Sequence, residues 1–226
     1  MMKAMTQSLD RCFMEMLCVV TLLATAQITA QAQAKTNFII LLADDLGYGD
    51  LGTYGHPTIQ TPNLDRMAAE GMKFTQFCVA AATCTPSRVG LVTGRLPIRS
   101  GVTQVLIPSS TGGLPKEEIT LAEILRERGY ATAWIGKWHL GWQDQYLPGN
   151  HGFDYYFGIP YSNDMSPETQ PGNPVFKEAP PTPLIRNSTT TNMEREPDQR
   201  LLTKQYTEEA IKFIKSAGKE KPFLLY

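Results

Sequence analysis

A cysteine followed four residues later by an arginine is the strongest indication of chemistry in this sequence. Cys84 and Arg88 stand in the run C-T-P-S-R, where Pro86 suits the first position of a helix because its missing N–H costs nothing there. Residues four apart share one face of a helix, and the free N–H groups at a helix start favour an anion. The run therefore predicts a nucleophile beside an anion-binding cation. The alternative for Cys84 is a buried structural thiol or a disulfide with Cys78.

Two adjacent carboxylates, Asp44 and Asp45, form a second candidate site. They close the apolar run of residues 35–45, which shows no alternation and so predicts a strand buried on both faces of a parallel sheet. Sites in such sheets collect at the carboxyl ends of strands. Adjacent carboxylates repel each other unless they are solvated or hold a cation, and oxygen ligands suit Ca²⁺ or Mg²⁺. The pair predicts a divalent-cation site, with a helix cap or solvated turn as the alternative.

A third candidate site follows the strand predicted over residues 130–135. Lys137 and His139 are two residues apart in G-K-W-H-L-G, so in an extended segment they point to one side and Trp138 to the other. A cation and an imidazole would then share one face at the carboxyl end of a strand. The alternative is a surface loop without function.

The remaining elements are those that an α/β chain needs to bring the three candidate sites together. A helix over 61–71 begins with a proline at its first position, and Leu64, Met67 and Ala68 form its apolar face. A capping box over 120–123 begins a helix that ends at Gly129. The further predicted elements are strands over 72–80 and 222–226, a helix over 202–217, and a short hairpin near 184–186 within a long excursion over 166–200.

The first 34 residues have the layout of a secretory signal peptide. Lys3 and Arg11 precede an apolar run over 16–24, and A-Q-A ends the stretch at Ala34. The run is shorter than the roughly 20 residues that span a bilayer, so we expect no membrane span. We predict cleavage after Ala34 and export, to the periplasm or outside in a bacterium, and to the lysosome or outside in a eukaryote. The alternative is a disordered or helical extension.

Composition limits the possible partners. The chain has 226 residues and a net charge of −1, which gives no reason to expect a nucleic-acid partner or an electrostatic membrane tether. Without the leader, Cys78 and Cys84 are the only cysteines, so the domain over 35–226 must rely on a packed core rather than a disulfide framework. The sequon at Asn187 would be used only in a eukaryotic secretory pathway.

The motifs together resemble those of the type I, formylglycine-dependent sulfatases. C-T-P-S-R with the following T-G-R matches that family's signature, and A-D-D-L-G-Y-G-D-L-G and G-K-W-H-L-G match its opening and second motifs. G-F-D and G-I-P-Y-S-N-D are similar to the arylsulfatase A-type and N-acetylgalactosamine-6-sulfatase-like branch. The resemblance covers 35–226 and implies an alkaline-phosphatase-like α/β/α sandwich with a mainly parallel central sheet.

The resemblance also implies roles for individual residues. Cys84 would be converted to formylglycine (3-oxoalanine) by a formylglycine-generating enzyme, and its hydrate would be the nucleophile that attacks the sulfate ester. Arg88 would orient this hydrate, and Lys137 would face the sulfate. His139 would act as a base toward the formylglycine, and Ser162 would either bind substrate or only stabilise its loop. The implied ligands of one Ca²⁺ are Asp44, Asp45 and Cys84.

Three functional hypotheses remain open at this stage. The first is a sulfuric ester hydrolase acting on an aryl sulfate or a sulfated sugar. The second is a phosphatase or phosphonate monoester hydrolase on the same scaffold. The third is a non-catalytic truncated product, because the later histidine, lysine and Asp-Asn metal pair of the family are missing. We therefore expect a truncated catalytic domain with little activity by itself.

Overall fold

The computed structural model describes residues 35–187, 193–194, 198–218 and 221–226. The predicted signal peptide over 1–34, with its cleavage site, lies outside the described residues, as do Ser188 and Thr189 of the sequon. Within the described part of the chain, no helix is both long and apolar enough to cross a membrane.

A six-stranded sheet organises the chain from Asn37 onward, with the strand order β1-β6-β2-β3-β4-β5. The first four strands in this order run parallel, and β4 and β5 add to them as an antiparallel hairpin. The predicted strands over 130–135 and 222–226 and the hairpin are confirmed. The strands are β1 (Phe38–Ile39), β2 (Ala131–Ile135), β3 (Tyr155–Gly158), β4 (Leu184–Arg186), β5 (Met193–Glu194) and β6 (Phe223–Leu225).

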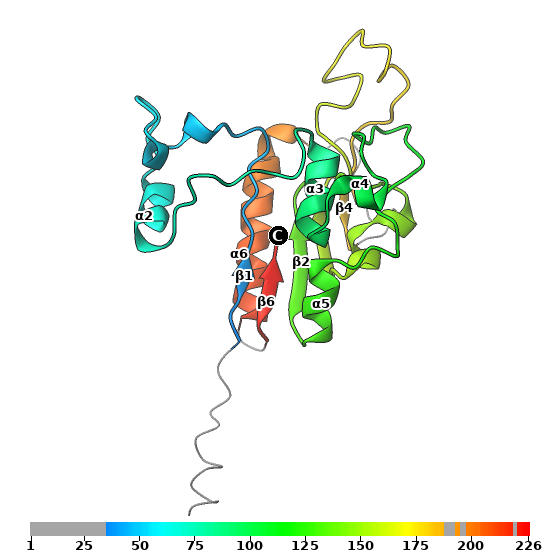
Figure 1. Cartoon of the computed structure of the whole chain (residues 1–226). Helices are drawn as coiled ribbons and strands as arrows, with labels where there is room; N and C mark the ends of the chain where they lie inside the picture. Colours follow the sequence, from blue (N-terminus) through cyan, green and yellow to red (C-terminus); the bar gives the residue numbers. More distant parts are fainter. Residues whose placement is uncertain (1–34, 188–192, 195–197, 219–220) are drawn as a thin grey trace, which may run out of the picture. The chain divides into compact units, whose positions relative to one another are not determined.

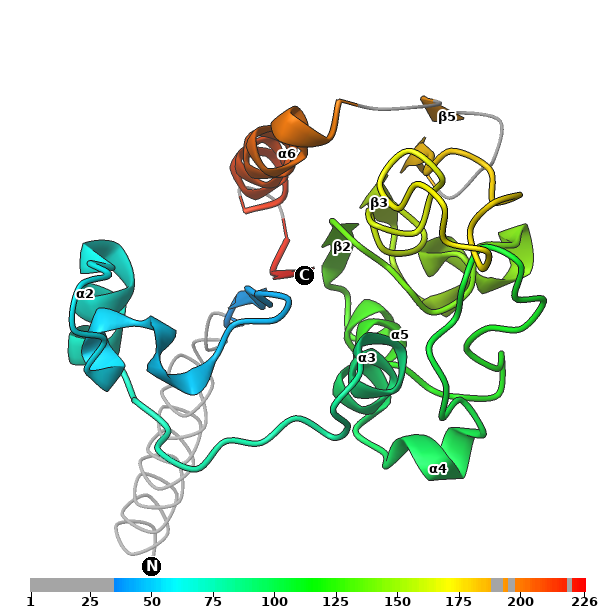
Figure 2. The ribbon, with the colours of Figure 1, turned by 90° about the horizontal axis from the view of Figure 1, so that it is seen from above.

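Helices cover both faces of this sheet (Figures 1 and 2). Successive side chains of a strand point to opposite faces. Trp134 accordingly packs with residues of α3 (Cys84–Thr93) and α5 (Leu121–Glu127), whereas its neighbour Ala133 packs with residues of α6 (Leu202–Ala217). These two cores confirm the predicted α/β architecture and the helix over 202–217.

The start of α5 follows the predicted capping box. The Glu123 N–H donates to Thr120 Oγ1 at 3.1 Å, and the Thr120 N–H donates to Glu123 Oε2 at 2.7 Å. Two N–H groups that have no partner within the helix are satisfied in this way. The chain after α5 turns at Gly129, which has a φ of 83° that favours glycine, and enters β2.

Two predictions about the segment between β1 and α3 were wrong. β1 has only two residues, and Phe38 and Ile39 are 42% and 49% exposed rather than buried, because β1 has a strand partner on one side only. Residues 72–80 form no strand, since no other described segment pairs with them. The predicted helix α2 (Pro62–Glu70) is confirmed and begins with a proline, and Leu64 and Met67 of its apolar face are 38% and 57% exposed.

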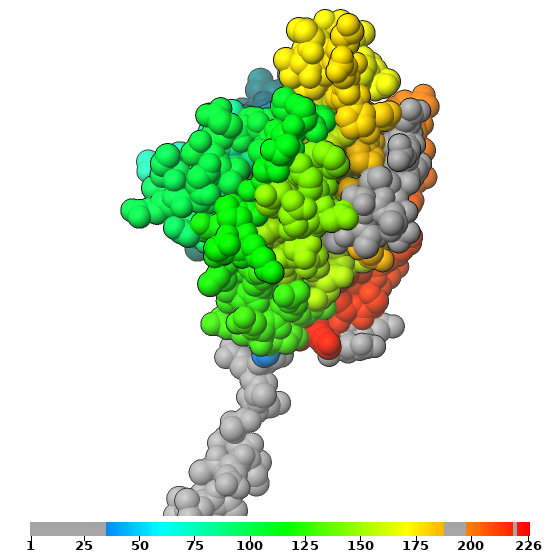
Figure 3. All heavy atoms as spheres, turned by 90° about the vertical axis from the view of Figure 1, so that its right-hand side faces the viewer, coloured from blue at the N-terminus to red at the C-terminus, as the bar shows by residue number. Residues whose placement is uncertain are grey.

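Long loops lie at the end of the sheet where β2 and β3 finish. Residues 166–183 form the expected excursion, drawn in yellow at the top of Figure 3. Tyr161, Met165 and Phe176 give this region a small apolar core of its own. The strand β3 was missed by the sequence analysis because Y-Y-F-G is too short to show a period. The shorter helices are α4 (Pro97–Ser100), η1 (Tyr48–Asp50), η2 (Gly52–Tyr54), η3 (Asp144–Tyr146), η4 (Pro148–His151) and η5 (Gln199–Leu201).

Candidate active site

Cys84 is the first residue of α3, and Thr83 is the N-cap. The prediction that Pro86 takes the first helical position was therefore wrong, because it takes the third. This position also suits proline, since the first N–H to bond within the helix is that of Ser87, which donates to the Thr83 carbonyl at 3.1 Å. Cys78 and Cys84 are both free thiols, so the alternative of a disulfide between them is not observed.

Three of the predicted site residues line one cavity together with Cys84. This cavity has a volume of about 260 Å³, and it lies between the loop after β1 and the start of α3. Asp44, Asp45 and Arg88 contribute to its wall. The two carboxylates and the cysteine–arginine pair, which are 40 positions apart in the chain, therefore form a single site.

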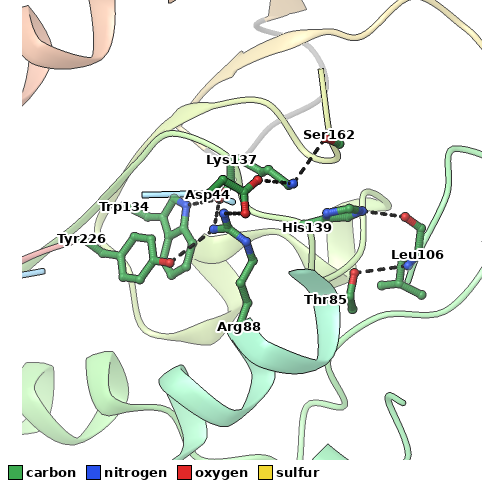
Figure 4. A network of polar contacts seen from close by, with 9 residues as sticks. All are labelled: Asp44, Thr85, Arg88, Leu106, Trp134, Lys137, His139, Ser162 and Tyr226. Atoms are coloured by element: carbon green, nitrogen blue, oxygen red, sulfur yellow. Dashed lines mark hydrogen bonds and ion pairs between the residues drawn. The ribbon is translucent and has the colours of Figure 1, made fainter. Parts of the chain in front are cut away.

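Asp44 is held between two cations (Figure 4). Its Oδ2 accepts a hydrogen bond from Lys137 Nζ at 2.5 Å, and its Oδ1 lies 3.5 Å from Arg88 Nη2. Burial raises the pKa of the Asp44 carboxyl, but the hydrogen bond from Lys137 and the two positive charges outweigh this effect and hold the pKa below its usual value. Lys137 also donates to Ser162 Oγ at 3.2 Å, so four predicted site residues are in contact.

Arg88 is buried, with only 4% of its side chain exposed, and three elements fix its position. Its Nη1 donates to the Lys137 carbonyl at 2.7 Å and to the Tyr226 hydroxyl at 3.2 Å. The Tyr226 ring stacks on Trp134, whose Nε1–H also donates to the Lys137 carbonyl. Tyr226 could not be identified as a site residue from the sequence, because its run F-L-L-Y indicates only a buried strand.

His139 is fully buried, and its backbone is left-handed with a φ of 61°. The segment is therefore not the regular extended one that we predicted, although Trp138 does pack in the core. The His139 N–H bonds to the Pro160 carbonyl at 3.0 Å, which helps to hold this unfavourable conformation. Burial, and then the charge of Lys137, lower the pKa of His139 to about 4, so the ring is neutral at pH 7.

The environment of His139 includes two residues that sequence analysis did not identify. Its Nε2 lies 2.6 Å from the Leu106 carbonyl oxygen, and the Leu106 N–H donates to Thr85 Oγ1 at 3.2 Å. The hydrogen-bond partner of His139 is a backbone carbonyl, which any residue could supply, so this contact could not be predicted from the sequence. His151, the other buried histidine, has its ring 5.9 Å from that of Trp138 in the core.

The donors at the cavity match a hard divalent cation in kind. Asp44 and Asp45 are adjacent residues of one turn and both line the cavity, and Asp45 adopts a φ of 56° that aspartate tolerates better than most residues. Within the described residues, no three acidic, histidine or cysteine side chains gather closely enough to hold a metal ion. Two carboxylates are part of the six to eight oxygens that Ca²⁺ takes.

Comparisons with known proteins agree on one family. The family model described as Sulfatase matches residues 36–226. Arylsulfatase G of Canis lupus familiaris is 47% identical over 210 residues, which are 85% of this chain and 39% of that protein. Arylsulfatase A of Bos taurus is 53% identical over 157 residues, which are 68% of this chain and 31% of that protein.

A solved structure supports the fold. Ps i-CgsB, in complex with k-i-k-neocarrahexaose, superposes with a TM-score of 0.71 at 34% identity, over 85% of this chain and 44% of that one. Together with the mostly parallel sheet and its flanking helices, this likeness confirms the alkaline-phosphatase-like α/β fold. The chain spans about 40% of the length of the curated relatives that match most of it.

Proposed function

The chain belongs to the sulfatase family, and from this premise we propose that it carries the nucleophile and the anion-binding residues of a sulfuric ester hydrolase. The observation that supports this proposal most directly is the contact of Arg88 and Lys137 with Asp44 beside Cys84. Two cations beside the start of a helix, next to the position of a nucleophile, suit a tetrahedral anionic group such as a bound sulfate ester.

Hydrolysis of a sulfate ester has three physical requirements. The anionic oxygens repel a nucleophile, so positive charge must be fixed around the sulfur. The nucleophile must be activated, and the alkoxide must be stabilised as it leaves. Lys137 and Arg88 meet the first requirement, because both side chains are already oriented by hydrogen bonds. Lys137 donates to Ser162 Oγ, and Arg88 donates to the Tyr226 hydroxyl and to the Lys137 carbonyl.

We propose that Cys84 is converted to formylglycine by a formylglycine-generating enzyme and that its hydrate is the nucleophile. One hydroxyl of the hydrate attacks sulfur, and the S–O bond to the alcohol breaks. His139 then accepts the proton of the remaining hydroxyl, the C=O bond forms again, and the bond from carbon to the sulfate oxygen breaks. A thiol or a serine has no second hydroxyl for this elimination. The buried, neutral ring of His139 is in the correct protonation state for a base.

A divalent cation, Ca²⁺ in this proposal, would be held by Asp44, Asp45 and the oxygens at position 84. When bound, it would supply further positive charge to the sulfate oxygens. Asp44 also pairs with Lys137 and Arg88, so the carboxylate that would hold the cation lies directly beside the two side chains that would bind the sulfate.

We propose an aryl sulfate or a sulfated sugar as the substrate. Among the solved relatives, BT4656 is described in complex with D-glucosamine-2-N,6-O-disulfate, at 26% identity and a TM-score of 0.64. Ser162, which contacts Lys137, would be a further donor to the substrate. Export through the leader over 1–34 is part of the same proposal.

A chimera tests the proposed function. Residues 37–226 would replace the matching stretch of the canine arylsulfatase G, and the product would be made with a formylglycine-generating enzyme. We expect turnover of an aryl sulfate, loss of that turnover in C84A, and little turnover of the matching aryl phosphate. A folded chimera that hydrolyses only the phosphate would indicate the phosphatase alternative. Turnover that survives in C84A would rule out the assigned nucleophile.

A further inference from the structure

The backbone of Leu106 lies between the His139 ring and the Thr85 side chain and bonds to both, through the two adjacent peptide groups that meet at its Cα (Figure 4). Its carbonyl oxygen is 2.6 Å from His139 Nε2, and its N–H donates to Thr85 Oγ1 at 3.2 Å. Thr85 and His139 are both fully buried. Thr85 directly follows Cys84 in the first turn of α3, so a single helix start both presents the nucleophile position and contacts the residue whose carbonyl His139 binds.

This arrangement decides which nitrogen of His139 carries the proton. A carbonyl oxygen can only accept, so a separation of 2.6 Å requires the proton on Nε2. The Nδ1 atom is buried, and no group among the described residues bonds to it. The opposite tautomer would set the Nε2 lone pair against the Leu106 carbonyl lone pairs and would bury an Nδ1–H without an acceptor. Both effects favour the Nε2–H tautomer.

We propose that Thr85 is a positioning residue that acts through Leu106. By accepting the Leu106 N–H, the Thr85 hydroxyl anchors the backbone on one side of the Leu106 Cα, which restrains the adjacent peptide group, keeps the Leu106 carbonyl aimed at Nε2, and holds His139 in the Nε2–H tautomer. Nδ1 is then the only proton acceptor of the ring. If the proposed function holds, Nδ1 is the atom that takes the proton from the hydrate; the tautomer assignment itself does not depend on turnover.

The tautomer can be read directly by NMR of the ¹⁵N-labelled chain. A protonated ring nitrogen and one with a free lone pair have well-separated ¹⁵N shifts, and the chain has only three histidines. The variants H56Q and H139Q would assign their signals. At neutral pH we expect Nε2 of His139 to be protonated and Nδ1 to be unprotonated. The reverse assignment in the wild-type chain would overturn the proposal without any variant.

The role of Thr85 is tested by T85V, which keeps the shape of the side chain and removes the acceptor. We expect the Leu106 amide to exchange at least tenfold faster with solvent and the His139 signals to move toward a mixture of tautomers. T85S should restore the wild-type pattern. The control is T182V, because Thr182 is buried and its hydroxyl has no partner among the described residues. If T85V does not fold, T85A takes its place with the same expected result. A variant without this hydroxyl that keeps the wild-type tautomer and amide exchange would show that Thr85 has no positioning role.

Discussion

Asp44 Oδ2 lies 2.5 Å from Lys137 Nζ, although the two residues are 93 positions apart. Asp44 follows β1 and Lys137 follows β2, two parallel strands that are separated in the sheet by β6. The carboxyl ends of parallel strands meet at one edge, so loops that are distant in the sequence come together there. The ion pair orients Lys137 before any ligand arrives, and this preorganisation is what an anion site requires.

Loss of the Lys137 charge should therefore affect the reaction rather than the fold. In the chimera with arylsulfatase G, we expect K137M to lower kcat by about 10²- to 10³-fold, the usual cost of removing one preorganised group that stabilises charge. Because Asp44 is 41% exposed and keeps Arg88 as a partner, and because the stem of Lys137 remains as methionine, the melting temperature should change little. K137R keeps the charge and should recover part of the rate. Equal rates for K137M and the parent chimera would contradict the assignment.

Position 84 should carry an aldehyde when the chain is made with a formylglycine-generating enzyme. Peptide mass spectrometry should show loss of the thiol at Cys84 and reaction of the product with a hydrazide. Cys78 is an exposed free thiol in the same chain and provides an internal control, since it should remain alkylatable. An alkylatable Cys84 under the same conditions would remove the basis of the proposed mechanism.

The contact of these site residues could be predicted from the sequence because it depends on local features. C-T-P-S-R fixes the cysteine and arginine at a helix start, and apolar runs place Asp44 and Lys137 at the ends of parallel strands. The hydrogen-bond partners could not be predicted in this way. The Leu106 carbonyl is a backbone group that any residue would supply. The Tyr226 hydroxyl accepts a hydrogen bond from Arg88 only because the tertiary fold brings the two residues together.

The wrong predictions concern segments whose structure depends on long-range partners. An apolar run such as 35–45 or 72–80 has the composition of a strand, but a strand exists only where a neighbour completes its hydrogen bonds. Residues 38–39 have β6 beside them, and 72–80 have no such partner among the described segments. The left-handed backbone of His139 was equally unpredictable, since its sequence context G-K-W-H indicates an extended chain.

The divalent-cation proposal predicts a thermal shift that depends on Asp45. Calcium should raise the melting temperature of the chain, and mass action gives about 2.7 kcal/mol at a concentration 100 times Kd. D45N is the appropriate variant, because asparagine tolerates the φ of 56° at this position and has no charge. We expect D45N to lose most of the shift and E70Q, which alters a 74% exposed glutamate on α2, to keep it. A full shift in D45N would show that the pair is only a solvated turn.

The Glu209 carboxylate should make stability depend on pH. Arg186 and Lys212 donate to it at 2.9 and 2.8 Å, and the Tyr155 hydroxyl donates at 2.6 Å, which ties α6 to β3 and β4. The hydrogen bond from Arg186 is the largest effect on the pKa of Glu209, which is lowered to about 2 despite burial. Because this pKa is lower in the folded than in the unfolded state, the ionised carboxylate stabilises the fold at pH values above the unfolded pKa of 4.5. This stabilisation is lost as the pH falls toward 2. Urea unfolding should therefore show E209Q to be less stable than the wild type by about 1–3 kcal/mol at pH 7.

This difference should shrink as the pH falls from 5 toward 2, because the wild-type carboxylate becomes protonated. E208Q is the matched control, since Glu208 is the neighbouring residue and is 54% exposed, in a 3.9 Å pair with Lys204. It should change stability by less than about 0.5 kcal/mol. A loss in E209Q that is the same at pH 7 and pH 3 would mean that the effect comes from packing and not from charge.

The last prediction is that the 226-residue chain, assayed by itself, turns over an aryl sulfate at least about 100-fold more slowly than the chimera. Protonation of a leaving group contributes roughly 10²- to 10⁴-fold, and none of the three histidines is free to supply it. His139 is assigned to elimination, His151 is buried in the core, and His56 is not among the residues that line the cavity at Cys84. The carboxylates at the cavity also supply only part of a cation's ligands.

The chain and the chimera would both be assayed with formylglycine confirmed at position 84, so that slow turnover by the chain cannot be explained by an unconverted cysteine. Equal rates would show that the described residues already complete the site and that the proton donor has been misassigned.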